Sequence, residues 1–417
     1  MLSRLAKGVA RNSTIIAERA SGVWVYDTHG KSYLDMTSGI GALSTGHSHP
    51  KVVSRVREQV GKIVHAQQNC VASHLPQQDF FKKMAPIVPD HLDTYFFTNS
   101  GSDAVENAIK LARKATGRPN IITCLGGFHG RTLGCMALST SRTSCRKGYQ
   151  PLMPGVFHVD FPYEVGELRQ PDWPQRLDIL LEKATAPEET AAILVEPILG
   201  EGGVHRADTE AMQYLREVCD KHGMLWISDE VQTGVGRTGN WWGYEHFGVE
   251  PDVIAFGKGI ASGFPLAGII SEKRHFDTIH TNGLGGTWNG NAVATEAANA
   301  TLDILKESRL VDQCQTKGQL VVDALMNRDN MHILTIRQYG LMIAIELDMD
   351  MDTFHTFMQE APNVGLLLLS TGMGPTIRLL PPLTITPHEI QEFTKRLYRL
   401  LGRIYGATAK GTAFMPI

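Results

Sequence analysis

The sequence predicts an α/β protein with a mostly parallel, helix-covered sheet and a second, smaller domain. Two observations carry this prediction. Between about residues 95 and 270, short apolar runs alternate with longer segments of helical periodicity. Towards the carboxyl end, the pattern changes to two apolar strands followed by one long helix.

The runs that we expect to form strands of the sheet are TYFFTN (94–99), NIITCL (120–125), AAILVEP (191–197), MLWISDE (224–230) and DVIAFGKG (252–259). Between the first two, SDAVENAIKLARKATG repeats apolar residues at helical spacing and ends on Gly117, so it predicts a helix. Near the carboxyl end, GLLLLS and TIRLLPPLTI predict strands. A helix follows, because Thr386, Pro387 and Glu389 form a cap, a first-turn proline and a capping-box acid.

Composition favours small-molecule chemistry. The 417 residues carry 40 basic and 43 acidic side chains, without a block of like charges suited to nucleic acid or an anionic membrane. The six cysteines show no C-x-x-C spacing, and no apolar run approaches the roughly 18 residues that cross a bilayer. We therefore expect reduced thiols and no nucleic-acid or membrane partner.

The amino end has two interpretations. Arg4, Lys7 and Arg11 precede the first acid, Glu18, a pattern that weakly resembles a mitochondrial transit peptide. The alternative is a basic amphipathic segment that packs on the domain after it. We expect a cytoplasmic protein, with a mitochondrial location as the alternative.

Lys258 is the first candidate for chemistry. It lies in AFGKGIASGFPLAG, a stretch of small and apolar residues that contains no carboxylate. The common interpretation is a solvated lysine in a glycine turn. A strand that delivers an unpaired ammonium into an apolar place would instead desolvate it, and the resulting neutral amine can form a Schiff base with an aldehyde.

Further candidates lie where strands end, since ligands of open parallel sheets bind beyond the carboxyl ends of the strands. Ser100, Gly101 and Ser102 join a strand to a helix, where N–H groups favour a phosphate, although an ordinary N-cap explains them as well. Asp229 ends a very apolar strand and needs a cation or donor, for which a pyridinium nitrogen is suitable. Phe128, within GGFHGRT, fits either a flat cofactor or the core.

Two motifs point elsewhere. GVGRTG (234–239) matches the dinucleotide fingerprint, but no strand runs straight into it and no apolar helix follows, so its context is wrong for nicotinamide binding. HSHP (47–50) lacks further ligands at metal-site spacing, and we expect a polar loop and no metal.

A phosphate cradle, an aromatic ring, an acidic partner and a desolvated lysine in one sheet match a pyridoxal 5′-phosphate site. Over nearly the whole chain, the motifs resemble those of the class III aminotransferases of fold type I, and most resemble the 4-aminobutyrate and ornithine aminotransferases. In the family's order they are TNSGSDAVENAIKLAR, GGFHGRT, LVEPILGEGG, ISDEVQTGVGRTG, AFGKGIASGFPLAG, GGTWNGN and IRLLPPLTIT.

The resemblance implies a large cofactor domain with a mostly parallel seven-stranded sheet over residues 51–310. It implies a small α+β domain from both chain ends, residues 1–50 and 311–417, and a homodimer with the active site at the subunit interface. The implied reaction is ping-pong transfer of an amino group from an ω-amino acid or amine, similar to 4-aminobutyrate, to a keto acid such as 2-oxoglutarate or pyruvate. An ornithine, acetylornithine or diamine donor is the alternative.

By the same resemblance, Lys258 forms the Schiff base and shuttles a proton, while Asp229 keeps the pyridine nitrogen protonated. The other implied cofactor contacts are Gly101, Ser102, Phe128, His129, Val231, Gln232 and, from the neighbouring subunit, Thr287.

The implied substrate contacts include two arginines. Arg131 would bind a carboxylate distant from the reacting amine, and Arg378 would bind the α-carboxylate of glutamate or 2-oxoglutarate. When an ω-amine is bound, Arg378 would pair with Glu201 instead. Ile40 and Glu196 complete the implied contacts. Taken without the motifs, each arginine is an ordinary surface ion pair.

Gln67, Gln68, Trp288 and Asn289 differ from what the 4-aminobutyrate enzymes have, which predicts a reshaped pocket. Three rival functions remain. Another pyridoxal phosphate reaction, such as that of an aminomutase, racemase or decarboxylase, would use the same lysine and aspartate. A nicotinamide oxidoreductase would rest on GVGRTG alone, and a non-catalytic binding protein would not need Lys258.

Overall fold

The structure is a computed structural model that describes residues 4–6, 8, 9, 11, 13–164, 172–326 and 332–408. Lys7, one of the three cations on which the targeting interpretation rests, lies outside the described residues, as do residues 1–3, 10 and 12. Within the described part of the chain, no helix combines the length and apolarity that crossing a bilayer requires.

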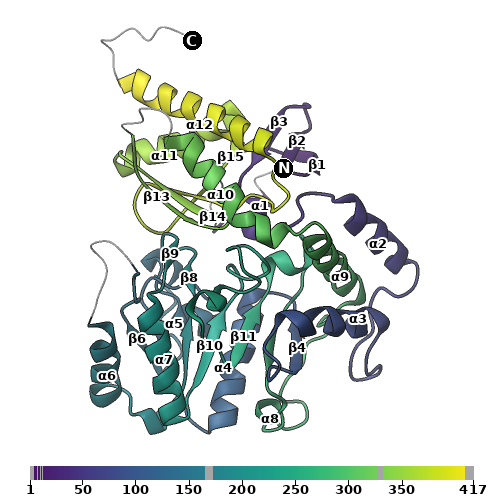
Figure 1. Cartoon of the computed structure of the whole chain (residues 1–417), viewed down its shortest axis with the longest axis vertical. Coiled ribbons are helices and arrows are strands. Elements are labelled where there is room, and N and C mark those ends of the chain that lie inside the picture. The colour runs from purple at the N-terminus through teal and green to yellow at the C-terminus, as the bar shows by residue number, and fades with distance from the viewer. Residues whose placement is uncertain are drawn as a thin grey trace.

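A seven-stranded sheet forms the core of the lower half of the molecule in Figure 1 and is called the central sheet. Its strands, in spatial order, are β4 (Thr94–Thr98), β12 (Ala267–Ser271), β11 (Val253–Phe256), β10 (Leu225–Asp229), β7 (Thr190–Val195), β5 (Asn120–Cys124) and β6 (Val156–Val159). Only β12 runs antiparallel to its neighbours, so the predicted mostly parallel sheet is confirmed. Five of these strands match the predicted runs, whereas β6 and β12 were not predicted.

Helices cover this sheet and extend beside it. They are α2 (Pro50–Val60), α3 (Leu75–Met84), α4 (Gly101–Thr116), α5 (Leu133–Leu138), α6 (Trp173–Lys183), α7 (Thr209–His222), α8 (Lys273–Phe276) and α9 (Ala292–Glu307). The predicted helix is α4, which begins after the cap Ser100 and ends where Gly117 adopts a left-handed conformation. Its apolar face packs against β11 and β12, which fixes its first turn at the edge of the sheet.

Two four-stranded sheets are built from the chain ends and lie above the central sheet in Figure 1. One contains β1 (Ala17–Ser21), β2 (Trp24–Asp27), β3 (Ser32–Asp35) and β15 (Leu366–Leu367), and the other β13 (Ile333–Tyr339), β14 (Met342–Leu347), β17 (Thr376–Leu379) and β16 (Leu369–Ser370). The remaining elements are the short hairpin β8 (Ile198–Leu199) and β9 (His205–Arg206), with helices α1 (Ser38–Gly41), α10 (Leu310–Met326), α11 (Met351–Glu360) and α12 (Pro387–Thr408).

The carboxyl-terminal segment differs from its prediction in one detail. GLLLLS is divided between β15 and β16, which belong to different sheets, because β15 pairs with β3 and β16 with β17. The pairing of β15 with β3 joins the two ends of the chain. The predicted capping box of α12 is confirmed, with Glu389 accepting the backbone N–H of Thr386 at 2.8 Å. Domain boundaries at residues 50 and 310 stay predictions.

GVGRTG is a junction between the central sheet and the carboxyl-terminal sheet. Arg237 is buried and donates from Nη1 to the carbonyl oxygens of Leu341, at 3.0 Å, and Pro381, at 2.5 Å. Gly236 has φ +85°, and a Cβ there would lie 2.8 Å from Val311. Gly236 therefore serves close packing in a backbone conformation that favours glycine.

The histidines of HSHP also have structural partners. His47 bonds to Asp35 through Nε2 at 2.8 Å, and His49 caps α2 by accepting the N–H of Lys51. Over the described ranges, no group of three or more metal-ligating side chains comes together.

Candidate active site

The candidate site lies at the edge where the parallel strands end. β4, β5, β7, β10 and β11 point their carboxyl ends to the same edge, and the segments that follow them enclose a cavity of about 150 Å³. The residues that line it are Gly101, Ser102, Phe128, His129, Gly130, Glu196, Asp229, Val231, Gln232 and Lys258. The fold therefore brings together residues from five separate parts of the sequence.

Asp229, the last residue of β10, forms a buried pair with His129. His129 Nδ1 lies 2.7 Å from Asp229 Oδ2, and His129 Nε2 lies 3.1 Å from the hydroxyl of Thr123. Burial alone would lower the pKa of His129, but the hydrogen bond to Asp229 and its charge outweigh burial, and the pKa is raised. The other oxygen of Asp229 accepts the N–H of Val231 at 3.2 Å, so the carboxylate is held on both sides.

Lys258 follows β11 and stands on a strained backbone. Its φ of +43° places a non-glycine residue in the left-handed region, a conformation that costs of order 1–3 kcal/mol and is found most at functional sites. Burial lowers the pKa of Lys258 to about 8, assisted by the nearby charge of Arg378 and opposed by the carboxylates of Glu196, Asp229 and Glu201. A substantial fraction of this amine is therefore neutral near pH 7 to 8.

Two glycines without room for a side chain form part of the cavity wall. A Cβ at Gly101 would lie 2.6 Å from Val231 Cγ1, and one at Gly130 would lie 2.2 Å from Ser102 Oγ. Gly101 and Ser102 are the first two residues of α4, whose first N–H groups have no partner within a helix. The Ser100 hydroxyl oxygen accepts the N–H of Asp103 at 3.2 Å, as an ordinary N-cap does. The N–H groups of Gly101 and Ser102 then remain at the positive end of the helix dipole.

Glu196 follows β7 and holds the loop that carries Phe128. It accepts the N–H of Phe128 at 2.8 Å and that of Gly200 at 3.0 Å. Burial raises the pKa of Glu196 to about 7, although the charge of His129 opposes the shift. The structure thus gives this residue a backbone-holding contact besides its place in the lining of the cavity.

Gln232, which lines the cavity, contacts a buried arginine from the small carboxyl-terminal sheet. Arg378, on β17, is 1% exposed and bonds Glu201 at 2.6 Å and the side-chain oxygen of Gln232 at 3.0 Å. Glu201 has a second arginine partner that was not predicted from the sequence: Arg142 Nη2 donates to its other carboxylate oxygen at 2.6 Å. Arg142 lies in the irregular segment after α5, where no motif or periodicity singled it out.

Five implied residues do not line this cavity in the single chain: Glu201 and Arg378, described above, and three exposed residues. Arg131 is exposed, with its guanidinium carbon 5.7 Å from the ring centre of Phe128. Thr287 is exposed in a loop, and Trp288 beside it is 61% exposed and stacks at a tilt on His65. Ile40 is exposed with φ +66°, an unusual conformation for a β-branched residue.

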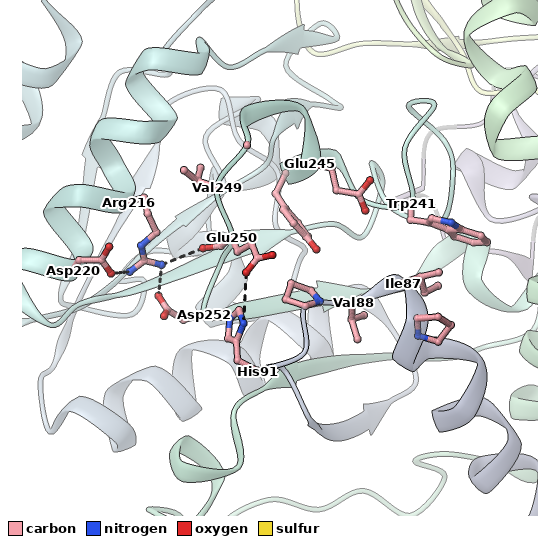
Figure 2. A pocket seen from close by; sticks show the side chains of 14 residues that line it. Ile87, Val88, His91, Arg216, Asp220, Trp241, Glu245, Val249, Glu250 and Asp252 are labelled. Atoms are coloured by element: carbon pink, nitrogen blue, oxygen red, sulfur yellow. Dashed lines mark hydrogen bonds and ion pairs between the residues drawn. The ribbon is translucent and has the colours of Figure 1, made fainter.

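A larger cavity, of about 780 Å³, lies elsewhere on the molecule (Figure 2). Two clusters of its charged groups are paired: Arg216 bonds Asp220 at 2.8 Å and Asp252 at 2.7 Å, and His91 lies 3.6 Å from Glu250. None of the residues proposed for chemistry lines this cavity.

The geometry beside Lys258 fits pyridoxal 5′-phosphate. Glycines leave room at a helix N-terminus, where a phosphate is favoured, and a buried carboxylate backed by histidine suits a protonated ring nitrogen. A lysine with a lowered pKa completes the set. Fold and site thus define a pyridoxal phosphate enzyme of the α/β class.

The comparisons identify the family. The model of the family "Aminotransferase class-III" matches residues 6–401, so the chain belongs to the class III aminotransferases. It is 36% identical to the 5-aminovalerate aminotransferase DavT of Pseudomonas aeruginosa and 38% identical to the 4-aminobutyrate aminotransferase GabT of Escherichia coli, over 93% of every chain in both comparisons. It is also 36% identical to the acetylornithine aminotransferase of Bacillus cereus, covering 94% of this chain and 96% of that one.

Solved structures agree. An omega transaminase of Pseudomonas jessenii in complex with PMP superposes with a TM-score of 0.87 at 27% identity, covering 95% of this chain and 94% of that one. The ornithine aminotransferase of Toxoplasma gondii gives a TM-score of 0.85 at 26% identity, covering 98% and 94%. The protein is therefore an aminotransferase that uses pyridoxal 5′-phosphate, and its substrates are small molecules.

Proposed function

We propose that this aminotransferase takes an amino group from an ω-amino acid such as 4-aminobutyrate or 5-aminovalerate and passes it to a keto acid such as 2-oxoglutarate or pyruvate, in ping-pong order. The observation that carries the proposal is the pair of Arg378 and Glu201, 2.6 Å apart and connected through Gln232 to the cavity. Relatives named for 4-aminobutyrate and 5-aminovalerate support this class of donor.

The pair lets one site accept two kinds of substrate. An ω-amino acid has no carboxylate beside its amine, and a buried, unpaired Arg378 would then cost free energy, so Glu201 neutralises it. Glutamate and 2-oxoglutarate bring their own α-carboxylate, whose two oxygens match the fork of a guanidinium. Arg131 would hold the carboxylate distant from the reacting amine, which is the single carboxylate of an ω-amino acid and the side-chain carboxylate of glutamate.

The cofactor would be held by the residues that line the cavity. Asp229, fixed by His129, would meet the ring nitrogen, and Gly101 and Ser102 would meet the phosphate. The faces of the cofactor ring would lie against the side chains of Phe128 and Val231. Gln232 would contact the ring hydroxyl. When bound, the cofactor supplies an aldehyde that accepts the amino group and a ring that withdraws electrons.

Lys258 would move the proton. With a pKa of about 8, it can take a proton from the substrate carbon that bears the amine near neutral pH. Its strained backbone at the end of β11 fixes where the amine points. Glu196 would contribute by holding the Phe128 loop against the site.

We also propose a homodimer in which Thr287 reaches the phosphate in the neighbouring subunit's site. Leu75, Leu133 and Trp288 are 83%, 62% and 61% exposed in the single chain, and large exposed apolar side chains favour association. Mixing inactive Lys258→Ala and weakened Thr287→Ala chains should restore activity, because a mixed dimer contains one intact site. Light scattering that shows a monomer, or a mixture without recovery, would contradict the shared site.

The decisive experiment is a half-reaction. The purified protein is titrated with 4-aminobutyrate, 5-aminovalerate, ornithine, putrescine, β-alanine, alanine and glutamate while the cofactor absorbance reports amino transfer. We expect 4-aminobutyrate or 5-aminovalerate and glutamate to react, and Arg131→Ala to lose the ω-amino acid preferentially. If only amines without a carboxylate react, the substrate class is wrong and the enzyme is an amine transaminase.

We propose that the protein is located in the cytoplasm. The cysteines in the described residues are free, as is usual in reducing compartments. Subcellular fractionation would test it, and recovery from mitochondria would favour the alternative.

A further inference from the structure

We propose that Arg142 is a second binding partner of the Glu201 carboxylate. Arg142 alone would bind this carboxylate when a substrate α-carboxylate occupies Arg378. The proposal rests on the function proposed above and adds to it a specificity-determining residue. Arg142 would act as a positioning residue, since it acts through Glu201 and is not among the residues that line the cavity.

Glu201 is shared between two arginines, with one oxygen on each. Oε1 lies 2.6 Å from Arg378 Nη2 and Oε2 lies 2.6 Å from Arg142 Nη2. Because the contacts use different oxygens, the carboxylate can leave Arg378 without leaving Arg142. A rotation of Glu201 towards Arg142 would uncover the fork of Arg378.

Charge balance favours such a hand-over. When a substrate carboxylate binds Arg378, Glu201 becomes a second negative charge beside it, in a partly buried place where repulsion is strong. Burial alone would raise the pKa of Glu201, but the charges of Arg378 and Arg142 outweigh burial and the pKa is lowered, so Glu201 stays ionised. Two carboxylates then need two cations, and Arg142 is the second.

The two arginines are unequal in a way that suits these roles. The side chain of Arg378 is 1% exposed and that of Arg142 is 37% exposed. Arg142 can thus keep its charge in contact with solvent whether or not Glu201 turns, whereas Arg378 needs a partner in both states.

The backbone around the pair is closely packed. Gly372 donates its N–H to the carbonyl oxygen of Glu201 at 2.6 Å, and a Cβ there would lie 3.0 Å from Cγ of Arg142 and 2.8 Å from the carbonyl oxygen of Ser141. The segment that contains Gly372 leads directly into β17, which carries Arg378. This contact packs the segment that carries Arg142 against the segment that leads to Arg378.

The test compares Arg142→Gln, Arg142→Lys and the control Lys147→Gln, an exposed cation in the same segment. The ligand is glutarate, a dicarboxylate without an amine, whose binding to the cofactor-loaded enzyme is measured by calorimetry and needs no turnover. We expect Arg142→Gln to raise the Kd of glutarate about tenfold, as the loss of one charge-assisted hydrogen bond would. Arg142→Lys should recover most of the affinity, and Lys147→Gln should match the wild type.

Kinetics supply the second readout. Arg142→Gln should raise KM when the acceptor 2-oxoglutarate is varied, and it should leave kcat/KM within about twofold when the donor 4-aminobutyrate is varied, because only the acceptor displaces Glu201. In a Glu201→Gln background the Arg142 effect on glutarate should vanish. Unchanged glutarate binding, equal losses for both substrates, or an effect that persists without Glu201 would overturn the inference. If the wild type uses neither donor nor acceptor, the proposed function fails, and the glutarate titration still decides the role of Arg142.

Discussion

The cavity beside Lys258 is smaller than the cavity beside Arg216, but it contains a lysine and a glutamate whose pKa values burial shifts towards neutrality. The first encloses about 150 Å³ and the second about 780 Å³. In the smaller one, burial lowers the pKa of Lys258 to about 8 and raises that of Glu196 to about 7. In the larger one, Arg216 forms ion pairs with Asp220 and Asp252 (Figure 2).

The larger cavity also contains a carboxylate with a raised pKa, Glu245, as the smaller cavity contains Glu196. Burial raises the pKa of Glu245 to about 7, but its carboxylate accepts the N–H of Trp242 at 3.2 Å as part of a helix cap. Cavity volume therefore does not indicate where the candidate active site lies. Desolvated titratable groups at the carboxyl ends of parallel strands indicate it.

Replacing Lys258 should have the largest effect. Lys258→Ala removes both the amine that takes the proton and the attachment point of the cofactor, so we expect kcat to fall by about a thousandfold or more. Single-turnover absorbance with the accepted ω-amino acid would measure it. A variant that keeps a tenth of wild-type activity would assign the proton transfer to another group.

Asp229→Asn should follow. The amide cannot hold a proton on the ring nitrogen as a carboxylate does, and we expect kcat to fall by about 100- to 1,000-fold, in the range of a lost electrostatic contact in a dry site. The cofactor's own absorbance band should shift in the same variant. A fall in cofactor affinity alone, with unchanged kcat at saturation, would reduce Asp229 to an anchor.

The pH dependence of Lys258 is the third expectation. Its pKa of about 8 lies below the ordinary 10.5, so the unfolded chain binds more protons between these values. The cost of burying the ammonium is therefore fully present below pH 8 and is relieved as the pH rises from about 8 to 10.5. In cofactor-free protein, the rate of labelling by an amine reagent, followed by mass spectrometry, should rise through pH 8 at Lys258, with exposed Lys147 as control. A midpoint near 10.5 would place Lys258 in contact with water.

Gly101→Ala should have a smaller effect. The added Cβ would lie 2.6 Å from Val231 Cγ1, so the first turn of α4 must shift, and overpacking of this kind costs about 1–3 kcal/mol. We expect a cofactor affinity about tenfold weaker, measured by fluorescence titration. Gly402→Ala on α12, where nothing lies within 4 Å, is the matched control and should leave affinity unchanged.

Glu250→Gln should have the smallest effect. Its side chain is 58% exposed and its contact with His91 is 3.6 Å, so both kcat/KM and Tm should change little, with activity within about twofold. Steady-state kinetics and thermal melting would check this. A large loss of activity would give the larger cavity a role in catalysis and end the comparison.

Sequence reasoning recovered the framework and left parts of the site out. Strands with strong apolar runs, such as β7 and β10, and the capped helices α4 and α12 were predictable because their signals are local. β6 and β12 were missed because a histidine interrupts the apolar run of β6 and a glycine that of β12, so that pairing with neighbouring strands decides their conformation. The division of GLLLLS between two sheets likewise depends on distant partners.

The order of residues along the chain was enough to establish the fold class, the family and the identity of the groups in the cavity, since motifs and apolar periodicity are local properties. Which of these groups meet depended on the folded chain. The pairing of His129 with Asp229 joins residues 100 positions apart, and the contact of Arg142 with Glu201 joins residues 59 apart. Contact energies depend on distance in space and on burial, and local sequence spacing determines neither of them. The contact of Arg142 with Glu201 could therefore be identified only from the tertiary structure.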